Sequence, residues 1–232
     1  VFCGAKKIKL ITEIARGGEG KIFSTDTKYV CKIYHPNKLT QERIEKLKLM
    51  VSREIDLDGL CWPIDLVTNI DRQIIGFLMK PASGECIQDL LTPKQVLLEK
   101  FPKKKKKNLI EIAISVVSKF EYLHKLNILV GDVNIRNILL SKDGKVSFVD
   151  VDSYQIEGYS CPVGTAVFTP VELQNMRFDN VLRNKNNELF SVATLIFMIL
   201  LPGKPPYSQQ GGESIQENIA VANFPYPLGE LS

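Results

Sequence analysis

The chain has 232 residues, of which 44% are hydrophobic and 24% charged, and its formal net charge is +4. This length and balance suit a globular protein with a sizeable core, built as one large domain or as two lobes. The mild positive charge would tolerate an acidic or phosphorylated partner without requiring one. The five scattered cysteines form no CxxC, which argues against a zinc site or a disulfide framework. There is no apolar run of about 18 residues and no signal-peptide pattern, so we expect a soluble, cytoplasmic protein with no membrane partner.

The first 80 residues read mainly as strands. Residues 8–14, 21–25 and 28–34 are β-like runs, and "CWPIDLVTN" and "RQIIGFLMK" add two more around an Asn-Ile-Asp turn. Between them, "LTQERIEKLKLMV" places its apolar residues near one helical face. Residues 1–80 are therefore predicted to form a small twisted sheet with one helix, and "PASGEC" is predicted to be a linker.

Helical periodicity dominates after the linker. Residues 108–126 form an amphipathic pattern, and residues 188–201 are almost wholly apolar, which predicts a buried helix. Residues 137–140 and 146–149 read as short strands around a Lys-Asp-Gly turn. The predicted fold class is thus α+β with two lobes.

A glycine-rich segment, "ARGGEGKI", lies between the first two long strands and reads as A-x-G-x-x-G-x-I. Glycines at such a turn let the backbone approach phosphates closely, although an ordinary β-turn has the same composition. A Rossmann loop would open a helix, and a Walker loop would need Gly-Lys-Ser/Thr, which is missing. The segment therefore favours a phosphate-covering loop between strands.

Lys32 interrupts the apolar strand "VCKIY". A lysine there is usually at a sheet edge with its ammonium group in water. Alternatively, the ammonium is aimed at nucleotide phosphates and held by a carboxylate of the following helix. Glu45 is then the first candidate partner and Glu42 the second.

Three polar residues in "LVGDVNIRNILLSKDGKVSFVDVDSY" complete this pattern. Asp132 and Asn137 fit D-x-x-x-x-N, and Asp150 follows one hairpin later. Phosphoryl transfer requires an aspartate that orients the acceptor hydroxyl, together with hard oxygen ligands for Mg²⁺. Each residue alone could simply cap a turn. The order of glycine loop, Lys32, Asp132, Asn137 and Asp150 favours the catalytic interpretation.

These segments resemble the protein kinase superfamily over nearly the whole chain. "ARGGEGKI" resembles the glycine-rich loop, "VCKI" the Val-Ala-Ile-Lys strand, and "YLHKLNILVGDVNIRNILL" the catalytic loop. "VDVD" stands in the place of Asp-Phe-Gly, and "VGTAVFTPVEL" resembles the end of the activation segment, with Glu172 as the Ala-Pro-Glu glutamate. The departures are most similar to a divergent bacterial Ser/Thr kinase-like group, some of whose members carry helix-hairpin-helix tails.

The resemblance implies an ATP-dependent protein kinase that transfers the γ-phosphoryl group to a Ser/Thr hydroxyl, with Mg²⁺ or Mn²⁺. It implies an N-lobe of residues 1–80, a hinge at 81–84 and a C-lobe of 85–232 that is incomplete at its end. Lys32 would contact the phosphates, Asp132 would orient the hydroxyl, Glu45 would hold Lys32, and Asn137 and Asp150 would bind the metal. The implied nucleotide-binding set also includes Ile14, Gly17, Gly18, Gly20, Ile22, Val30, Met79, Lys80, Pro81, Ala82 and Leu139.

Several positions depart from the family pattern. Gly131 replaces the arginine before the catalytic aspartate, so a clamp for an activation-loop phosphate is missing. Asn134 replaces a lysine that contacts the γ-phosphate. Asp152 replaces the glycine of Asp-Phe-Gly, where its carboxylate either tunes metal binding or caps the next turn. Asn187 or Glu188 stands where an aspartate supports the catalytic loop.

Other functions stay open. A nucleotide-binding pseudokinase that acts as a scaffold would keep the same cleft residues, and an interaction module would need none of them. The lysine run Lys103–Lys107 is expected in a solvated loop, with a patch for an acidic or nucleic-acid partner as the alternative. The sequence does not indicate the protein substrate.

Overall fold

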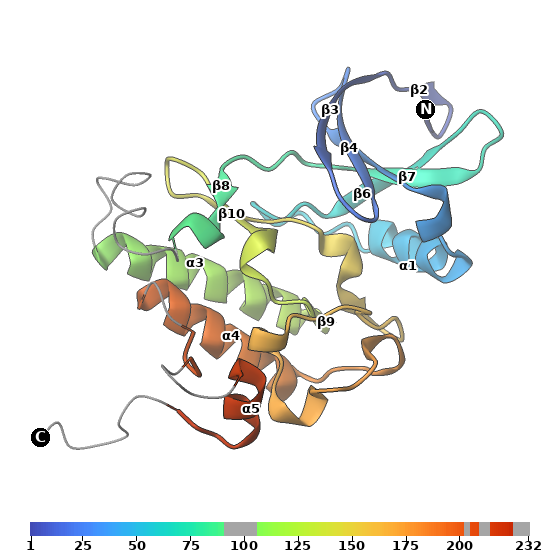
Figure 1. Cartoon of the computed structure of the whole chain (residues 1–232). Coiled ribbons are helices and arrows are strands. Elements are labelled where there is room, and N and C mark those ends of the chain that lie inside the picture. The colour runs from blue at the N-terminus through green and yellow to red at the C-terminus, as the bar shows by residue number, and fades with distance from the viewer. Residues whose placement is uncertain (91–105, 202–204, 209–213, 225–232) are drawn as a thin grey trace, which may run out of the picture. The chain divides into compact units, whose positions relative to one another are not determined.

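The computed structural model describes residues 1–90, 106–201, 205–208 and 214–224. They belong to two compact units (Figure 1). Unit 1 comprises Val1–Ser83 and Ser147–Asp152, and unit 2 comprises Gly84–Val146 and Ser153–Ser232. Together they combine a curled antiparallel sheet with helices, which confirms the α+β, kinase-like fold class.

Unit 1 is built on a seven-stranded antiparallel sheet with the order β2-β1-β6-β7-β5-β4-β3. Its strands are β1 (Phe2–Cys3), β2 (Lys6–Lys7), β3 (Leu10–Arg16), β4 (Gly20–Thr25), β5 (Val30–Tyr34), β6 (Pro63–Thr68) and β7 (Ile74–Met79). All five predicted strands are present. β5 begins two residues later than predicted because the Thr25 hydroxyl binds Thr27 and the Tyr29 carbonyl, which fixes a turn. The two-residue strands β1 and β2 were too short to leave a periodic signal.

The helix of unit 1 is α1 (Gln41–Ser52), as predicted. The side chain of Thr40 caps its N-terminus by accepting a hydrogen bond from the Arg43 N–H. At its other end, the indole of Trp62 donates to the Met50 carbonyl at 2.8 Å. Trp62 is therefore a packing residue, and it fixes α1 to the chain that enters β6.

The core of unit 1 has two clusters because strand side chains alternate between the faces of the sheet. One cluster is Val30, Tyr34, Leu47, Cys61, Phe77 and Met79. The other is Ile8, Cys31, Val67 and Leu78. Val30 and Tyr34 flank Lys32 at alternate positions of β5, so Lys32 shares the face that also packs against Leu47 of α1.

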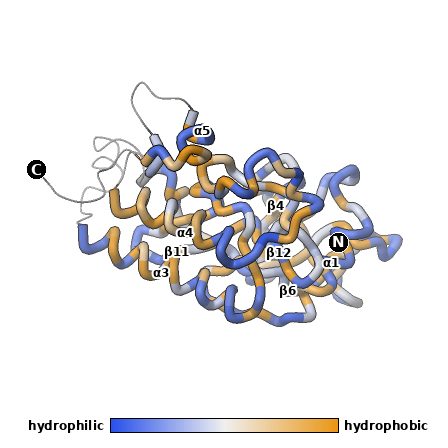
Figure 2. The backbone as a smooth tube through the Cα atoms, turned by 90° about the horizontal axis from the view of Figure 1, so that it is seen from below, coloured by the Kyte–Doolittle hydropathy of each residue, from blue (hydrophilic) through white to orange (hydrophobic). Residues whose placement is uncertain are grey.

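Unit 2 is mainly helical. Among its described residues the α-helices are α3 (Lys106–Lys125), α4 (Lys185–Leu200) and α5 (Ile215–Ala220). α3 and α4 pack side by side, and apolar residues recur along both (Figure 2). Its strands are β8 (Glu85–Cys86), β9 (Ile128–Leu129), β10 (Ile138–Leu140) and β12 (Gln155–Ile156), while β11 (Val146–Phe148) runs from unit 2 into unit 1. The pairs β8–β10 and β9–β12 are antiparallel.

Short 3₁₀ helices occupy much of the remaining chain. They are η1 (Pro36–Lys38), η2 (Ile87–Leu90), η3 (Ile135–Asn137), η4 (Val151–Ser153), η5 (Ala166–Phe168), η6 (Val171–Leu173) and η7 (Phe178–Asn180). Single turns of this kind have no long periodicity in sequence, which explains why none was predicted.

Two helix predictions need correction. α4 begins three residues earlier than predicted, because Asn184 and Asn187 form a capping box, and it is not wholly buried, since Leu189 is 52% exposed. α3 begins at Lys106, so Lys106 and Lys107 are exposed helical residues rather than loop residues. Residues 103–105 lie outside the described residues, as does most of the predicted lysine patch.

Candidate active site

The ammonium group of Lys32 is buried at the centre of the sheet in unit 1. β5 lies between β4 and β7, so Lys32 is not on an edge strand, and the residue is only 5% exposed. A buried ammonium group must be paired, because desolvation strongly disfavours an isolated charge. The edge-strand interpretation is therefore wrong, and the partners of Lys32 define the site.

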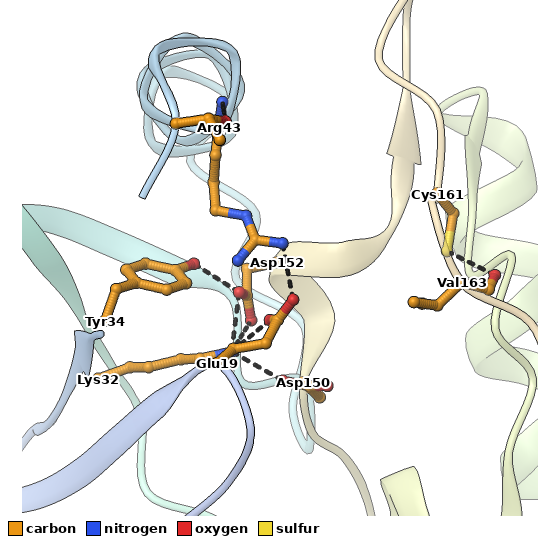
Figure 3. Close-up of polar contacts among 9 residues, drawn as sticks. Glu19, Lys32, Tyr34, Arg43, Asp150, Asp152, Cys161 and Val163 are labelled. Atoms are coloured by element: carbon orange, nitrogen blue, oxygen red, sulfur yellow. Dashed lines mark hydrogen bonds and ion pairs between the residues drawn. The ribbon is translucent and has the colours of Figure 1, made fainter. Parts of the chain in front are cut away.

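Asp152 is the most buried of these partners. Lys32 Nζ lies 2.7 and 2.8 Å from its two carboxylate oxygens, and the Tyr34 hydroxyl donates to Oδ2 at 2.5 Å (Figure 3). Burial alone would oppose ionisation of Asp152, but the Lys32 ammonium and these hydrogen bonds lower its pKa below the ordinary value. Burial also opposes the charge on Lys32, and the two aspartates overcome it and raise the lysine pKa. Both groups are therefore charged at neutral pH.

Asp150 is the second partner and lies nearer the solvent. Its Oδ1 is 2.7 Å from Lys32 Nζ, and its side chain is 46% exposed. Its backbone adopts the left-handed region with φ of 57°. A non-glycine residue in this region is uncommon and often marks a functional position. The carboxylate is thus held beside Lys32 and still accessible to a ligand.

The glycine-rich turn supplies a third carboxylate. Glu19 lies 3.6 Å from Lys32 Nζ and 2.7 Å from a guanidinium nitrogen of Arg43 on α1. The guanidinium of Arg43 also lies over the Tyr34 ring, 5.3 Å from its centroid. α1 therefore contributes the cation Arg43 to this group of charges, and Arg43 contacts the group by its ion pair with Glu19.

Glu45, predicted as the partner of Lys32, is not its partner in this structure. Its carboxylate accepts hydrogen bonds from Gln41 and Lys48 on α1 itself. The second candidate, Glu42, is exposed in the first turn of α1. The helical periodicity showed that both residues lie off the apolar stripe, but it could not show which carboxylate elsewhere in the chain reaches Lys32.

The chemistry of these donors suits a hard divalent cation. One carboxylate oxygen from each of Glu19, Asp150 and Asp152 lies within 4.8 Å of the others. Carboxylate oxygens are the ligands that Mg²⁺ prefers, usually one or two per site together with phosphate oxygens. Asp152 is buried against Lys32 and Tyr34, and Glu19 is bound to Arg43, so the half-exposed Asp150 is the residue that fits a metal ligand best.

The glycine-rich segment forms a tight connection between β3 and β4. The Gly17 N–H donates to the Gly20 carbonyl at 2.9 Å. A Cβ on Gly20 would lie 2.3 Å from the Ile33 carbonyl oxygen, so this position requires glycine. Nothing lies within 4 Å of the positions that a Cβ would take on Gly17 and Gly18. The turn thus leaves open space along its backbone, as a phosphate-covering loop needs.

The other residues predicted to line the nucleotide site differ in their surroundings. Val30, Met79, Ile22 and Ala82 all belong to the same apolar cluster of unit 1. Ile14 on β3 is 55% exposed. Lys80 is exposed and paired with Asp56, and Pro81 follows it directly. Leu139 lies on β10 of unit 2.

The predicted catalytic loop in unit 2 is fixed by hydrogen bonds from the activation segment. The hydroxyl of Thr165 donates to Asp132 Oδ1 at 2.9 Å. Asn134 in turn donates to that hydroxyl at 3.0 Å. Asn137 ends the short helix η3 within the same loop. Thr165 thus orients the Asp132 carboxylate, and Asn134 orients Thr165.

Glu188 supports this loop from α4. One of its carboxylate oxygens accepts from the Gly131 N–H at 2.7 Å, and the other is 2.5 Å from His124 Nε2. Of the two candidates, Glu188 rather than Asn187 therefore fills the supporting position. Asn187 instead donates to Glu172 at 2.7 Å. His124 is thus a structural histidine with a carboxylate partner.

Gly131 makes room for a buried arginine. A Cβ at this position would lie 2.8 Å from a guanidinium nitrogen of Arg183 and 2.4 Å from Cys161 Cβ, and φ is +73°. Arg183 donates to the carbonyls of Cys161 and Val163 at 2.9 and 2.7 Å. Its guanidinium also lies 4.3 Å from the centroid of the Phe178 ring. Arg183 thus holds this part of the activation segment through its backbone carbonyls.

Sequence reasoning missed four residues of these networks, namely Glu19, Tyr34, Arg43 and Arg183. Tyr34 carried a usable signal, because it lies two residues after Lys32 on a strand and therefore on the same face. The others meet their partners only through the tertiary fold, across 20 to 24 residues.

Comparisons with known proteins agree with this architecture. The chain is 31% identical over 230 residues to protein kinase YegI of Escherichia coli O157:H7 and 30% identical to that of Escherichia coli strain K12, covering 92% of this chain in each case. It spans about a third of the length of these curated relatives, 35% in both cases. It is also 25% identical over 215 residues to myosin light chain kinase A of Dictyostelium discoideum, covering 90% of this chain and 69% of that protein.

No family model matches the chain, as expected for a sequence that departs from the common kinase pattern at several positions. No helix among the described residues is long and apolar enough to cross a membrane. The relatives align with almost all of the sequence, and the fold has the curled antiparallel sheet and helices that the resemblance implies. The chain therefore belongs to the protein kinase superfamily, within a divergent bacterial group.

Proposed function

We propose that this chain is an ATP-dependent protein kinase that phosphorylates Ser/Thr hydroxyl groups of a protein substrate. The observation that carries the proposal is the buried ammonium of Lys32, paired at 2.7 Å with the half-exposed carboxylate of Asp150. A buried cation beside an accessible carboxylate suits a metal-bound triphosphate, since the cation attracts phosphate oxygens and the carboxylate binds the metal. The kinase relatives support the same reaction class.

Each residue has a definite task in this reaction. Lys32 holds the α- and β-phosphate oxygens, and the N–H groups of the Gly17–Gly18 turn cover the phosphates. Asp150, together with Asn137 as the family resemblance implies, would hold Mg²⁺ or Mn²⁺ through oxygen ligands, and this would supply neutralisation of the charge that develops on the phosphates. Asp132 accepts the hydrogen bond of the acceptor hydroxyl and orients it, while Thr165 fixes the Asp132 carboxylate. Adenine is held by the apolar side chains Ile22, Val30 and Met79, and its edge by the backbone of residues 80–82.

Phosphate transfer from γ-labelled ATP tests the proposal directly. Wild-type protein is incubated with Mg²⁺ or Mn²⁺ and a mixture of protein substrates, beside the variants Asp132→Ala and Asp71→Asn. Removal of the group that orients the hydroxyl should lower the rate by roughly 10²- to 10⁴-fold. Asp71 is exposed in the turn after β6 and serves as the matched control. Equal labelling by wild type and Asp132→Ala would contradict the proposal.

A second candidate is a pseudokinase that binds the nucleotide without turnover. Asn134 favours it, because this residue replaces the lysine expected for the γ-phosphate and its amide is engaged with Thr165. The two functions differ in one result. A pseudokinase would gain thermal stability from Mg-ATP and yet label no protein, whereas the kinase would do both.

A further inference from the structure

The third residue of the "DVD" sequence poses a separate question. In the family pattern this position is a glycine, which has no side chain, whereas Asp152 has a carboxylate that is only 2% exposed. Burial of an ionised carboxylate is costly unless it is paired and hydrogen-bonded. The contacts of Asp152 must therefore offset the desolvation cost of its carboxylate.

Neither role suggested by the sequence agrees with the contacts of Asp152. Its oxygens accept from Lys32 and Tyr34 and from no backbone N–H of the next turn, so it does not cap that turn. The two Asp152 oxygens accept three hydrogen bonds from Lys32 and Tyr34, so a metal ion would have to compete with these contacts, whereas the Asp150 side chain beside them is half-exposed. Asp152 is therefore built to face Lys32.

The two aspartates of this segment differ in exposure, and this difference suits them to different roles at Lys32. Both contact Lys32 at 2.7 Å, but the Asp150 side chain is 46% exposed and the Asp152 side chain 2%. A metal ion that recruits Asp150 would take this carboxylate from Lys32. The lysine would then keep two charge-assisted hydrogen bonds to Asp152, which Tyr34 holds in place.

The helix α1 does not perform this task in the structure. Glu45 is bound to Lys48 and Gln41, and the residue that α1 directs towards the cluster is the cation Arg43. Arg43 repels Lys32 and attracts Glu19, so α1 contributes to the charge balance but does not hold the ammonium group. Among the described residues, Asp152 is the fully buried carboxylate that contacts Lys32.

We propose that Asp152 is the positioning residue of Lys32, taking the part that a carboxylate of α1 was expected to play. The inference rests on the proposed nucleotide-binding function, because it concerns how Lys32 is aimed at phosphates. It predicts that the contribution of Asp152 to nucleotide binding passes through Lys32 and does not depend on the metal ion.

A double-mutant cycle on nucleotide affinity tests this inference without measuring turnover. The probe is N-methylanthraniloyl-ADP, titrated by fluorescence in Mg²⁺ and again in EDTA. The variants are Asp152→Asn, Lys32→Met, the double variant, and Asp71→Asn as the control. Asp152→Asn should weaken binding by about tenfold, the range expected for a hydrogen bond to a charged group, in Mg²⁺ and in EDTA alike. In the Lys32→Met background the same change should weaken binding by less than about twofold.

Tyr34→Phe provides a milder variant in case Asp152→Asn lowers the stability of the fold. It removes one hydrogen bond to Asp152 and leaves the ion pair with Lys32 in place. It should weaken ADP binding by about threefold, again only when Lys32 is present. Circular dichroism of each variant establishes that the protein is folded before titration.

The possible outcomes separate the inference from the proposed function. A loss that appears only with Mg²⁺ would make Asp152 a metal ligand and overturn the inference, and so would equal losses with and without Lys32. If Glu45→Gln weakened ADP binding more than Asp152→Asn does, Glu45 on α1 would be the residue that positions Lys32, and the inference would be overturned. If the wild-type protein does not bind ADP at all, the proposed function itself fails.

Discussion

Asp150 shows how strongly a single residue depends on its local surroundings. It lies two residues after the end of β11 in a left-handed backbone conformation, and its half-exposed carboxylate contacts Lys32. Asn and Asp tolerate this conformation better than most residues. The side chain can therefore exchange its ammonium partner for a metal ion without a large movement of the backbone.

We expect Asp150→Asn to abolish the Mg²⁺-dependent part of nucleotide binding, because an anionic ligand becomes neutral. Isothermal titration with ADP in Mg²⁺ and in EDTA measures this part as the difference between the two affinities. Asp143→Asn, in the exposed turn between β10 and β11, is the control. An unchanged difference in the Asp150 variant would place the metal on other residues.

The buried thiols of unit 1 give a prediction that concerns pH. Burial raises the pKa of Cys31 to about 12 and that of Cys61 to about 11. Because only the thiolate reacts, at pH 8 a group with a pKa near 11 is ionised to about one part in a thousand. Iodoacetamide should therefore leave both thiols unmodified in the folded protein at pH 8 and label them in guanidinium. Mass spectrometry of the peptides measures the difference, and rapid labelling under native conditions would contradict the described packing.

At the scale of elements, the catalytic loop is held by two neighbours in unit 2. α4 supplies Glu188, which binds the Gly131 N–H and His124, and the activation segment supplies Thr165, which binds Asp132. A carboxylate that accepts two hydrogen bonds in a buried position is costly to remove, because its donors are left unpaired.

Glu188→Ala should therefore lower the free energy of unfolding by roughly 2–3 kcal/mol. Urea denaturation followed by circular dichroism gives this value, and the activity should fall as well because the catalytic loop loses its support. Glu121→Ala is the matched control on α3, since this carboxylate is exposed and paired only with Lys125. A midpoint shift of Glu188→Ala no larger than that of Glu121→Ala would show that the loop does not depend on α4.

The activation segment gives the second prediction at this scale. Arg183 binds the carbonyls of Cys161 and Val163, while Arg136 donates to Gln88 and Arg177 pairs with Asp179. These arginines are therefore already engaged. Phosphorylation of Tyr159 or Ser160 would add charge of about −1.5 to −2, and these three arginines already have other partners.

We expect the rate of phosphatase-treated protein to stay within about twofold of that of untreated protein, because ordering does not require a phosphate. Tyr159→Phe and Ser160→Ala should behave in the same way. Arg183→Lys should instead lower the rate regardless of phosphatase treatment, since lysine cannot supply the two-pronged donor set. A large and reversible fall in rate on dephosphorylation would contradict this prediction.

At the scale of the whole molecule, the proposed chemistry draws on both units. Unit 1 contains Lys32, Asp150 and the glycine-rich turn, and unit 2 contains Asp132 and Asn137. The chain passes from unit 2 into unit 1 and back within residues 147–152. This short passage therefore carries both the proposed metal ligand and the residue that we assign to Lys32.

The sequence by itself determined the types and the order of the main elements. Apolar residues at intervals of two or of three to four record which face of a strand or helix is buried, and this information is local. It therefore predicted the five long strands of unit 1 and the helices α1, α3 and α4. The set Lys32, Asp132, Asn137 and Asp150 was predicted instead from residue types and their order along the chain.

Only the tertiary structure decided which charges meet. Lys32 and Asp152 are separated by 120 residues, and Gly131 and Glu188 by 57. Periodicity carries no information over such distances. The sequence therefore pointed to Glu45 on the neighbouring helix as the partner of Lys32, whereas in the structure that partner is Asp152. Because Lys32 lies on the buried face of a central strand, its ammonium group is shielded from solvent and needs a charged partner. The buried carboxylate that the fold brings to it is Asp152.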